Sequence, residues 1–325
     1  MQFTLGISSD LLTNEGNPCF GKQPLKALYK EKEIHVEWMD PSIKILSEKE
    51  TSKYDAILLN SPKLTRDSIN TKSNKLKIVS RFGVGYDSVD LNVLKENKII
   101  LTNTPNAVKR PVAVASLTMI LALSGKIMIK DNLLREGRWH ERTDHMGVGL
   151  TNKILGLVGF GRISREFVKI SKKLFKKVIC YDPFVGKEEM KNLQVDKVDF
   201  DEIANSSDFL VILCDLNEKT RGMIDSSFLN KMKRNSYLIN LSRGPVVNEN
   251  DLIVTLRQNK IAGAGLDVMT KEPIEENNEL INLKNTLLTP HSLCWTDECF
   301  NSIANEAISS ILNYFNNKPI LNRVV

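Results

Sequence analysis

Short runs of apolar and β-branched residues alternate with longer amphipathic segments along most of the chain. The runs typical of buried strands lie at Phe3–Ile7, Ala56–Leu59, Ile78–Ser80, Ile154–Val158, Lys177–Tyr181, Phe209–Leu213, Tyr237–Asn240 and Gly263–Leu266. Strands separated by helices of ten or more residues are typical of parallel βαβ units. The pattern therefore predicts an α/β protein built from doubly wound parallel sheets.

One helix can be predicted directly from its spacing. After Gly161, apolar side chains follow at Ile163, Phe167, Ile170 and Leu174, at intervals of four, three and four residues. This spacing places them on one face of an α-helix that packs on a sheet.

Two proline-containing segments predict where the chain passes between domains. Residues 103–106 (Asn-Thr-Pro-Asn) and 288–291 (Leu-Thr-Pro-His) are plausible hinges, because a proline restricts itself and the residue before it. A length of 325 residues suits two domains. We expect a central domain at residues 104–289 and a second domain made from residues 1–103 and 290–325.

A glycine-rich turn precedes the helix just described. Gly159 permits a tight turn, and Gly161 lets the backbone approach a pyrophosphate at the helix N-terminus. Arg162 and Ile163 begin the helix. Ser164 stands where a third glycine usually allows close packing of helix on strand, and a small serine should be tolerated there with a slight shift. The turn predicts a dinucleotide-binding site.

An acidic residue strengthens this prediction and indicates which dinucleotide binds. Asp182 lies 18 residues beyond Ser164, directly after the strand at Lys177–Tyr181. A carboxylate there accepts hydrogen bonds from both adenosine ribose hydroxyls and repels a 2′-phosphate. The alternative for Asp182 alone is an exposed residue of the turn that it forms with Pro183. Together with the strand, glycines and helix, it predicts NAD as the cofactor in preference to NADP.

Composition and charge narrow the class of protein. Hydrophobic residues make up 42% and charged residues 26%, and 45 basic against 39 acidic residues give a net charge of +6, as in ordinary soluble proteins. Five scattered cysteines argue against a disulfide framework. The longest apolar run, Val112–Leu123, is too short to span a bilayer, and the N-terminus lacks a signal-peptide pattern. We expect a cytoplasmic protein without a membrane partner.

Neither nucleic acid nor a metal is expected as a partner. The densest basic cluster, residues 172–177, ends a helical pattern and is typical of a solvated helix terminus. His291, Cys294 and Cys299 match no zinc-ligand spacing.

Further polar motifs follow the predicted strands. They are Arg81-Phe82-Gly83-Val84-Gly85-Tyr86-Asp87, Asn103-Thr104-Pro105, Thr220-Arg221-Gly222-Met223-Ile224, Asn240-Leu241-Ser242-Arg243-Gly244-Pro245, Gly265-Leu266-Asp267-Val268-Met269-Thr270-Lys271-Glu272-Pro273 and Thr289-Pro290-His291. In order and spacing, residues 78 to 300 resemble the D-isomer-specific 2-hydroxyacid dehydrogenases, the family of phosphoglycerate dehydrogenase and glyoxylate/hydroxypyruvate reductase. The resemblance implies a Rossmann NAD-binding domain and a discontinuous, flavodoxin-like substrate domain.

By this resemblance three residues form the catalytic set. Arg243 would anchor the substrate carboxylate and polarise its carbonyl, since a planar guanidinium offers several N–H groups. His291 would act as acid and base, because the imidazole pKa lies near physiological pH. Glu272 would orient the imidazole and raise its pKa. Taken singly, each residue would more often have no catalytic role. Arg243 would be a surface arginine, His291 a loop histidine and Glu272 a solvated acid.

The resemblance also assigns residues to substrate and cofactor. Val84 and Gly85 would present backbone N–H groups to the substrate carboxylate, which glycines allow to approach closely. Asp267 would face the nicotinamide carboxamide or ribose, while Leu241 and Ser242 would line the nicotinamide pocket.

Some positions depart from the family pattern. Cys214-Asp215-Leu216 replaces a common His-x-Pro-Leu and adds a carboxylate on the adenine side. Lys109 and Arg110 replace a more neutral helix start, where they would hold a second acidic group of the substrate or form a solvated helix terminus.

The resemblance implies an NAD-dependent oxidoreductase that transfers a hydride between a D-2-hydroxy acid and its 2-keto acid, with the acid itself left open. The alternative is an NAD-responsive, corepressor-like binding protein of the same fold. Related enzymes are homodimers, and residues 139–150 are the expected contact. Because the chain ends soon after its last predicted helix, we expect it to lack the appended regulatory domain of some phosphoglycerate dehydrogenases.

Overall fold

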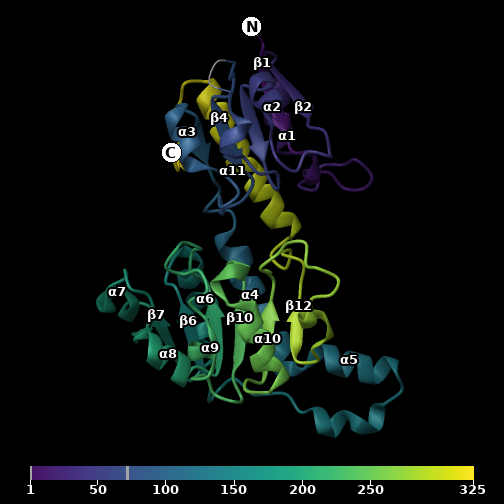
Figure 1. The fold of residues 1–325 in the computed structure, drawn as a ribbon, viewed down its shortest axis with the longest axis vertical. Helices are drawn as coiled ribbons and strands as arrows, with labels where there is room; N and C mark the ends of the chain where they lie inside the picture. Colours follow the sequence, from purple (N-terminus) through teal and green to yellow (C-terminus); the bar gives the residue numbers. More distant parts are fainter. Residues whose placement is uncertain (1, 71–72) are drawn as a thin grey trace. The chain divides into compact units, whose positions relative to one another are not determined.

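The computed structural model describes residues 2–70 and 73–325. These form two compact units (Figure 1), one made of Met1–Val108 with Trp295–Val325 and the other of Lys109–Cys294. The chain passes between the units at 108/109 and at 294/295. Each boundary lies five residues later than the one expected at 103/104 or at 289/290. His291 therefore belongs to the central unit, and not to the unit formed by the two ends of the chain.

The first unit contains a five-stranded parallel sheet in the order β2-β1-β3-β4-β5, the flavodoxin-like order. Its strands are β1 (Phe3–Ile7), β2 (Ile34–Trp38), β3 (Ala56–Leu59), β4 (Ile78–Arg81) and β5 (Ile100–Thr102). Its helices are α1 (Leu25–Lys30), α2 (Glu48–Lys53), α3 (Leu91–Glu96) and α11 (Asp297–Phe315), with short 3₁₀ turns at Ser9–Leu11 and Arg66–Ser68. Helix α11 returns from the end of the chain to this sheet, where Ser80 Oγ donates to the Ala307 carbonyl at 3.0 Å.

The second unit contains a seven-stranded parallel sheet in the order β12-β11-β10-β9-β6-β7-β8. Its strands are β6 (Ile154–Val158), β7 (Lys177–Tyr181), β8 (Asp196–Lys197), β9 (Phe209–Ile212), β10 (Tyr237–Asn240), β11 (Gly263–Leu266) and β12 (Thr286–Leu288). Counted from β6, the order is that of dinucleotide-binding domains, with β12 added at one edge. The predicted fold class is therefore confirmed for both units.

Helices cover the seven-stranded sheet and separate its strands along the chain. They are α4 (Lys109–Gly125), α5 (Ile127–Arg135), α6 (Arg162–Ser171), α7 (Lys187–Lys191), α8 (Phe200–Ser206), α9 (Ser226–Leu229) and α10 (Glu249–Arg257), with 3₁₀ turns at Trp139–His145, Lys172–Leu174, Gly244–Val246 and Glu279–Asn282. The predicted helix after Gly161 is α6, and its Phe167 is fully buried. Leu174 departs from the prediction, because the α-helix ends at Ser171 and Leu174 is 39% exposed.

The central strands are buried on both faces. In β9, Phe209 and Val211 belong to the hydrophobic cluster on one side of the sheet, and Leu210 and Ile212 to the cluster on the other. Continuous apolar runs are expected where helices cover both faces of a parallel sheet. This explains why these strands were recognisable in the sequence.

Among the described residues, no single helix is long and apolar enough to cross a membrane. Helices α4 and α5 reach the required length only as a pair, which bends by 55° at its break. The apolar run in α4 was expected to be buried, and this holds for one face only. Met119 and Ile120 are fully buried, but Val114 and Leu121 are 45% and 43% exposed.

Candidate active site

The glycine turn connects β6 to the N-terminus of α6. Gly159 has a φ of +95°, and a Cβ there would lie 2.8 and 2.9 Å from the backbone N and Cα of Cys214. Gly161 is the N-cap of α6, and nothing lies within 4 Å of the position that its Cβ would take. Gly159 thus lets the chain turn, while Gly161 leaves open space where helix N–H groups favour an anion.

Asp182 lies beside this turn, directly after β7. Its Oδ2 accepts a hydrogen bond from Phe160 N at 2.7 Å, and its Oδ1 accepts from Phe184 N and Val185 N at 2.8 and 3.1 Å. The carboxylate therefore joins the glycine turn to the turn that follows β7. Oδ1 already accepts two hydrogen bonds, whereas Oδ2 accepts one and keeps a second acceptor site, so a ribose hydroxyl can still bind there.

The start of α6 completes the cofactor cradle. Arg162 is exposed and Ile163 is partly buried. Ser164 is fully buried, and its Oγ has no hydrogen-bond partner among the described residues. Serine thus fits at the position of the third glycine, but it leaves a buried hydroxyl without a partner, which carries a cost in stability.

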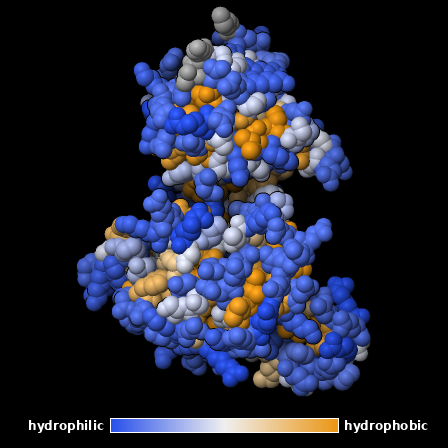
Figure 2. Space-filling model, viewed as in Figure 1, coloured by the Kyte–Doolittle hydropathy of each residue, from blue (hydrophilic) through white to orange (hydrophobic). Residues whose placement is uncertain are grey.

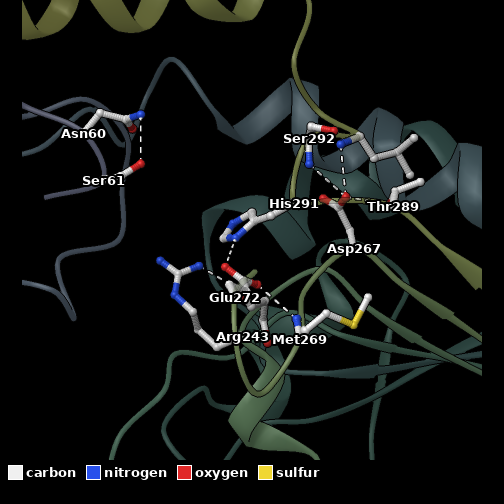
Figure 3. Close-up of polar contacts among 11 residues, drawn as sticks. Asn60, Ser61, Arg243, Asp267, Met269, Glu272, Thr289, His291 and Ser292 are labelled. Atoms are coloured by element: carbon white, nitrogen blue, oxygen red, sulfur yellow. Dashed lines mark hydrogen bonds and ion pairs between the residues drawn. The ribbon is translucent and has the colours of Figure 1, made fainter. Parts of the chain in front are cut away.

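His291 and Glu272 form the centre of a second cluster in the same unit (Figure 3). His291 Nδ1 lies 2.8 Å from Glu272 Oε2, and the two side chains are 43% and 40% exposed. Glu272 Oε1 accepts from Met269 N at 3.0 Å. The carboxylate is thereby held by its own loop on one side and orients the imidazole on the other.

The charges of this pair support each other. The hydrogen bond to Glu272 raises the pKa of His291, although burial and the nearby Arg243 both act to lower it. Burial acts to raise the pKa of Glu272, but the hydrogen bond and charge of His291 outweigh it, so that this pKa is lowered. The arrangement favours the imidazolium–carboxylate ion pair.

Arg243 reaches this pair from the loop after β10. Figure 3 shows its guanidinium pointing toward Glu272 and His291. Asn240, only 1% exposed, shapes the loop, because its Oδ1 accepts from Ser242 N and Oγ at 3.0 and 3.1 Å, and its Nδ2 donates to the Arg243 carbonyl at 3.0 Å. Gly244 allows this loop to pack closely against the loop that carries Met269, because a Cβ at Gly244 would lie only 2.0 Å from the Met269 carbonyl. Sequence reasoning missed these supporting roles of Asn240 and Gly244.

Asp267, at the end of β11, holds the chain segment that carries His291. Its Oδ1 accepts from Thr289 Oγ1 at 2.6 Å and from Ser292 N and Leu293 N at 3.0 and 3.1 Å. Burial raises the pKa of Asp267. These bonds explain why residues 290–294 stay with the central unit.

His291 itself has a φ of +54°. Left-handed backbone costs about 1–2 kcal/mol for a residue with a side chain, although histidine adopts it more often than most residues. The bonds to Asp267 on either side of His291 hold this conformation. Such strain, stabilised by its surroundings, is common at functional sites.

The predicted substrate loop lies in the other unit, after β4. Gly83 has a φ of +128°, and its N–H donates to Thr104 Oγ1 at 3.1 Å. Asn103 Nδ2 donates to the Val84 carbonyl at 2.9 Å. These bonds hold the turn that carries Val84 and Gly85, with both residues partly exposed.

The remaining predicted positions are placed as follows. Leu241 is 8% exposed, and Ser242 follows it in the Asn240 turn. Arg110 forms an ion pair with Glu166 of α6 at 2.8 Å, which supports a helix-terminus role for it. No group of three or more potential metal ligands occurs in residues 2–70 and 73–325.

The fold and the two clusters together define a class of protein. A glycine turn with an acidic partner binds a dinucleotide, and an arginine beside a histidine–carboxylate pair suits proton transfer on a carboxylate-bearing substrate. Residues 117–292 match the D-isomer specific 2-hydroxyacid dehydrogenase, NAD binding domain.

Relatives extend this match beyond the central unit. The chain is 34% identical to the D-3-phosphoglycerate dehydrogenase of Archaeoglobus fulgidus over 276 residues, which is 85% of this chain and 52% of that protein. It is 33% identical to the glyoxylate reductase of Thermococcus litoralis over 299 residues, 89% of each. The chain belongs to the D-isomer-specific 2-hydroxyacid dehydrogenase family, and its cofactor is NAD.

Solved structures share the fold. The D-lactate dehydrogenase of Aquifex aeolicus, complexed with NAD and lactic acid, superposes with a TM-score of 0.83 at 24% identity, over 96% of each chain. This chain spans about half the length (52%) of the phosphoglycerate dehydrogenase of Archaeoglobus fulgidus.

Proposed function

We propose that the protein is an NAD-dependent dehydrogenase that interconverts a D-2-hydroxy acid and its 2-keto acid. The observation that carries this proposal is the 2.8 Å contact between His291 Nδ1 and Glu272 Oε2, with Arg243 beside it. NAD, when bound, accepts or supplies the hydride. Every other step falls to side chains of the chain itself.

Each residue of the cluster has a distinct role. His291 Nε2 gives a proton to the oxygen of the keto group during reduction and takes it back during oxidation, while Nδ1 stays on Glu272. Arg243 binds the substrate carboxylate and stabilises negative charge on the reacting oxygen. By resemblance to the family, the backbone N–H groups of Val84 and Gly85 are also assigned to substrate binding.

The cofactor roles follow the cradle described above. The pyrophosphate is bound at the N-terminus of α6 by Gly159, Gly161, Arg162 and Ile163. Asp182 binds the adenosine ribose. Leu241, Ser242 and Asp267 border the nicotinamide. Asp267 suits a carboxamide because its Oδ1 is occupied by three donors, which leaves Oδ2 to accept from an amide N–H.

The test is oxidation of NADH by the purified protein, followed by absorbance, with a panel of 2-keto acids that includes glyoxylate, hydroxypyruvate and phosphohydroxypyruvate. We expect rapid turnover of one class of acid, lost by about 10²–10⁴-fold in His291→Ala. His35→Ala, in the first unit, is the matched control and should keep full activity. NADH binding without turnover of any acid would contradict the proposal and favour the corepressor-like alternative.

The homodimer and the cytoplasmic location remain part of this proposal. Large apolar side chains are exposed along α5 and the segment after it, and Figure 2 shows hydrophobic patches on this unit among mostly hydrophilic residues. They are Ile127 (54%), Met128 (55%), Leu134 (64%), Trp139 (63%) and Met146 (73%). Exposed apolar side chains gathered in this way are typical of protein interfaces. Light scattering of the purified protein measures the oligomeric state, and a monomer at micromolar concentration would contradict the dimer.

A further inference from the structure

The glycine turn lies between two acidic residues that follow neighbouring strands. In the sheet, β6 pairs with β7 on one side and with β9 on the other. Asp182 directly follows β7, and Asp215 stands three residues after β9. The carboxyl ends of parallel strands share one edge of the sheet, so both acids lie at the edge where the turn binds its ligand.

Close contacts hold the Asp215 segment against the glycine turn. The backbone of Cys214, next to Asp215 in the chain, is the group that a Cβ on Gly159 would meet at 2.8 Å. Burial is the main cause that raises the pKa of the Cys214 thiol to about 12, and the charges of Asp215 and Asp182 raise it further. Both carboxylates therefore act on the same small region beside the turn.

The two acids differ in how their charges are compensated. Asp182 accepts from three backbone N–H groups. Asp215 is exposed, and among the described residues no hydrogen-bond donor or cation contacts its carboxylate. Thr220 Oγ1 instead donates to the Asp215 main-chain carbonyl at 2.7 Å. This bond holds the loop through its backbone and does not involve the Asp215 carboxylate. Asp215 thus contributes negative charge without a structural role for its side chain.

We propose that Asp215 is a second determinant of cofactor specificity, which disfavours NADP by adding its uncompensated carboxylate to that of Asp182. This inference rests on the proposed function, because it requires the adenosine half of the cofactor to lie beside the glycine turn. The 2′-phosphate of NADP carries between one and two negative charges at neutral pH. Repulsion acts on this group and spares NAD, whose ribose bears only hydroxyls.

The experiment is a fluorescence titration of the full chain with NADH and with NADPH, in the absence of any keto acid. For Asp215→Asn we expect the Kd of NADPH to fall about three- to tenfold and that of NADH to change less than about twofold. Glu218→Gln, an exposed acid of the same loop, removes the same charge and is the matched control. It should change neither Kd.

Ionic strength gives a second reading of the same effect. Exposed charges are screened over about 30 Å at 0.01 M salt and about 3 Å at 1 M. The preference of the unchanged protein for NADH should therefore shrink as salt rises, and the decrease should be smaller in Asp215→Asn.

Three results would overturn the inference. An unchanged ratio of the two Kd values in Asp215→Asn would show that its charge has no influence on the choice. Equal weakening of both cofactors would show that Asp215 holds the adenosine. An equal effect of Glu218→Gln would assign the change to net charge. If the unchanged protein bound neither cofactor, the proposed function itself would fail, a result distinct from these three.

Discussion

Glu272→Gln tests how the carboxylate acts through His291. Glutamine keeps the size of the side chain and an oxygen that can accept from Met269 N, as Glu272 does at 3.0 Å. It removes the negative charge at 2.8 Å from His291 Nδ1. The substitution therefore separates charge from position.

The expected loss of rate follows from the strength of the bond that is changed. Hydrogen bonds to charged groups contribute about 1.5–3 kcal/mol and neutral ones about 0.5–1.5 kcal/mol. The two side chains are 43% and 40% exposed, so solvent screening reduces this difference to the lower part of its range. A loss of about 1 kcal/mol corresponds to a five- to tenfold lower kcat.

The direction of the pH effect follows from the raised pKa of His291, whose first cause is the bond to Glu272. The pKa of His291 should therefore be lower in Glu272→Gln than in the unchanged protein. Reduction needs the protonated imidazole, so as the pH rises the rate of reduction should begin to fall at a lower pH in the variant. Oxidation needs the neutral imidazole, so in that direction the variant should stay active to a lower pH.

The assay measures kcat/KM as a function of pH for both reduction and oxidation. The pH dependence of kcat/KM reports the pKa values of the essential acid and base in the free enzyme. Glu275→Gln is the matched control, because Glu275 lies three residues further on, is exposed and pairs with Lys271. If the pH profiles of Glu272→Gln and the unchanged protein coincide in both directions, Glu272 does not set the pKa of His291 and the reasoning is refuted.

Three further substitutions, with Gly161→Ala as a control for one of them, test the neighbouring elements. Arg243→Lys keeps the charge but loses the planar fork, so the KM for the keto acid should rise about 10–100-fold, whereas an unchanged KM would exclude a carboxylate contact. Asn240→Ala leaves Ser242 N and the Arg243 carbonyl without their partner, so kcat should fall, and full activity would show that the loop holds its shape alone. In Gly159→Ala the new Cβ would lie 2.8 Å from the backbone N of Cys214, at an unfavourable φ of +95°. Urea unfolding should show a free energy of unfolding lower by about 2–4 kcal/mol. Gly161→Ala, with open space around it, should lower this free energy much less.

Prediction from sequence worked best where the local pattern and the tertiary environment agree. The strands β6, β7, β9, β10 and β11 are mostly apolar because the sheet is covered on both faces. Strands β5, β8 and β12 were missed because they are only two or three residues long, and β2 was missed because only Ile34 of its five residues is buried. Their pairing with neighbouring strands, more than their own composition, makes them strands.

The candidate site divides in the same way. Gly159, Gly161 and Asp182 could be found from spacing, because a turn, a helix start and the end of the next strand lie within one βαβ unit. The support of the catalytic cluster could not, because its contacts join distant segments. Asp267 reaches Ser292 and Leu293 across 25 and 26 residues, and no local pattern records such contacts.

The sequence by itself determined the fold class, the family, the cofactor turn and the residue types of the catalytic cluster, since each follows from local spacing or from motifs in order. Only the tertiary structure decided which unit carries His291. Pro290 and His291 were expected to begin the last part of the second domain, yet Asp267 binds residues on both sides of His291 and keeps them with β11. A proline indicates where a chain can bend, but the domain boundary is set by where long-range bonds stop holding the backbone.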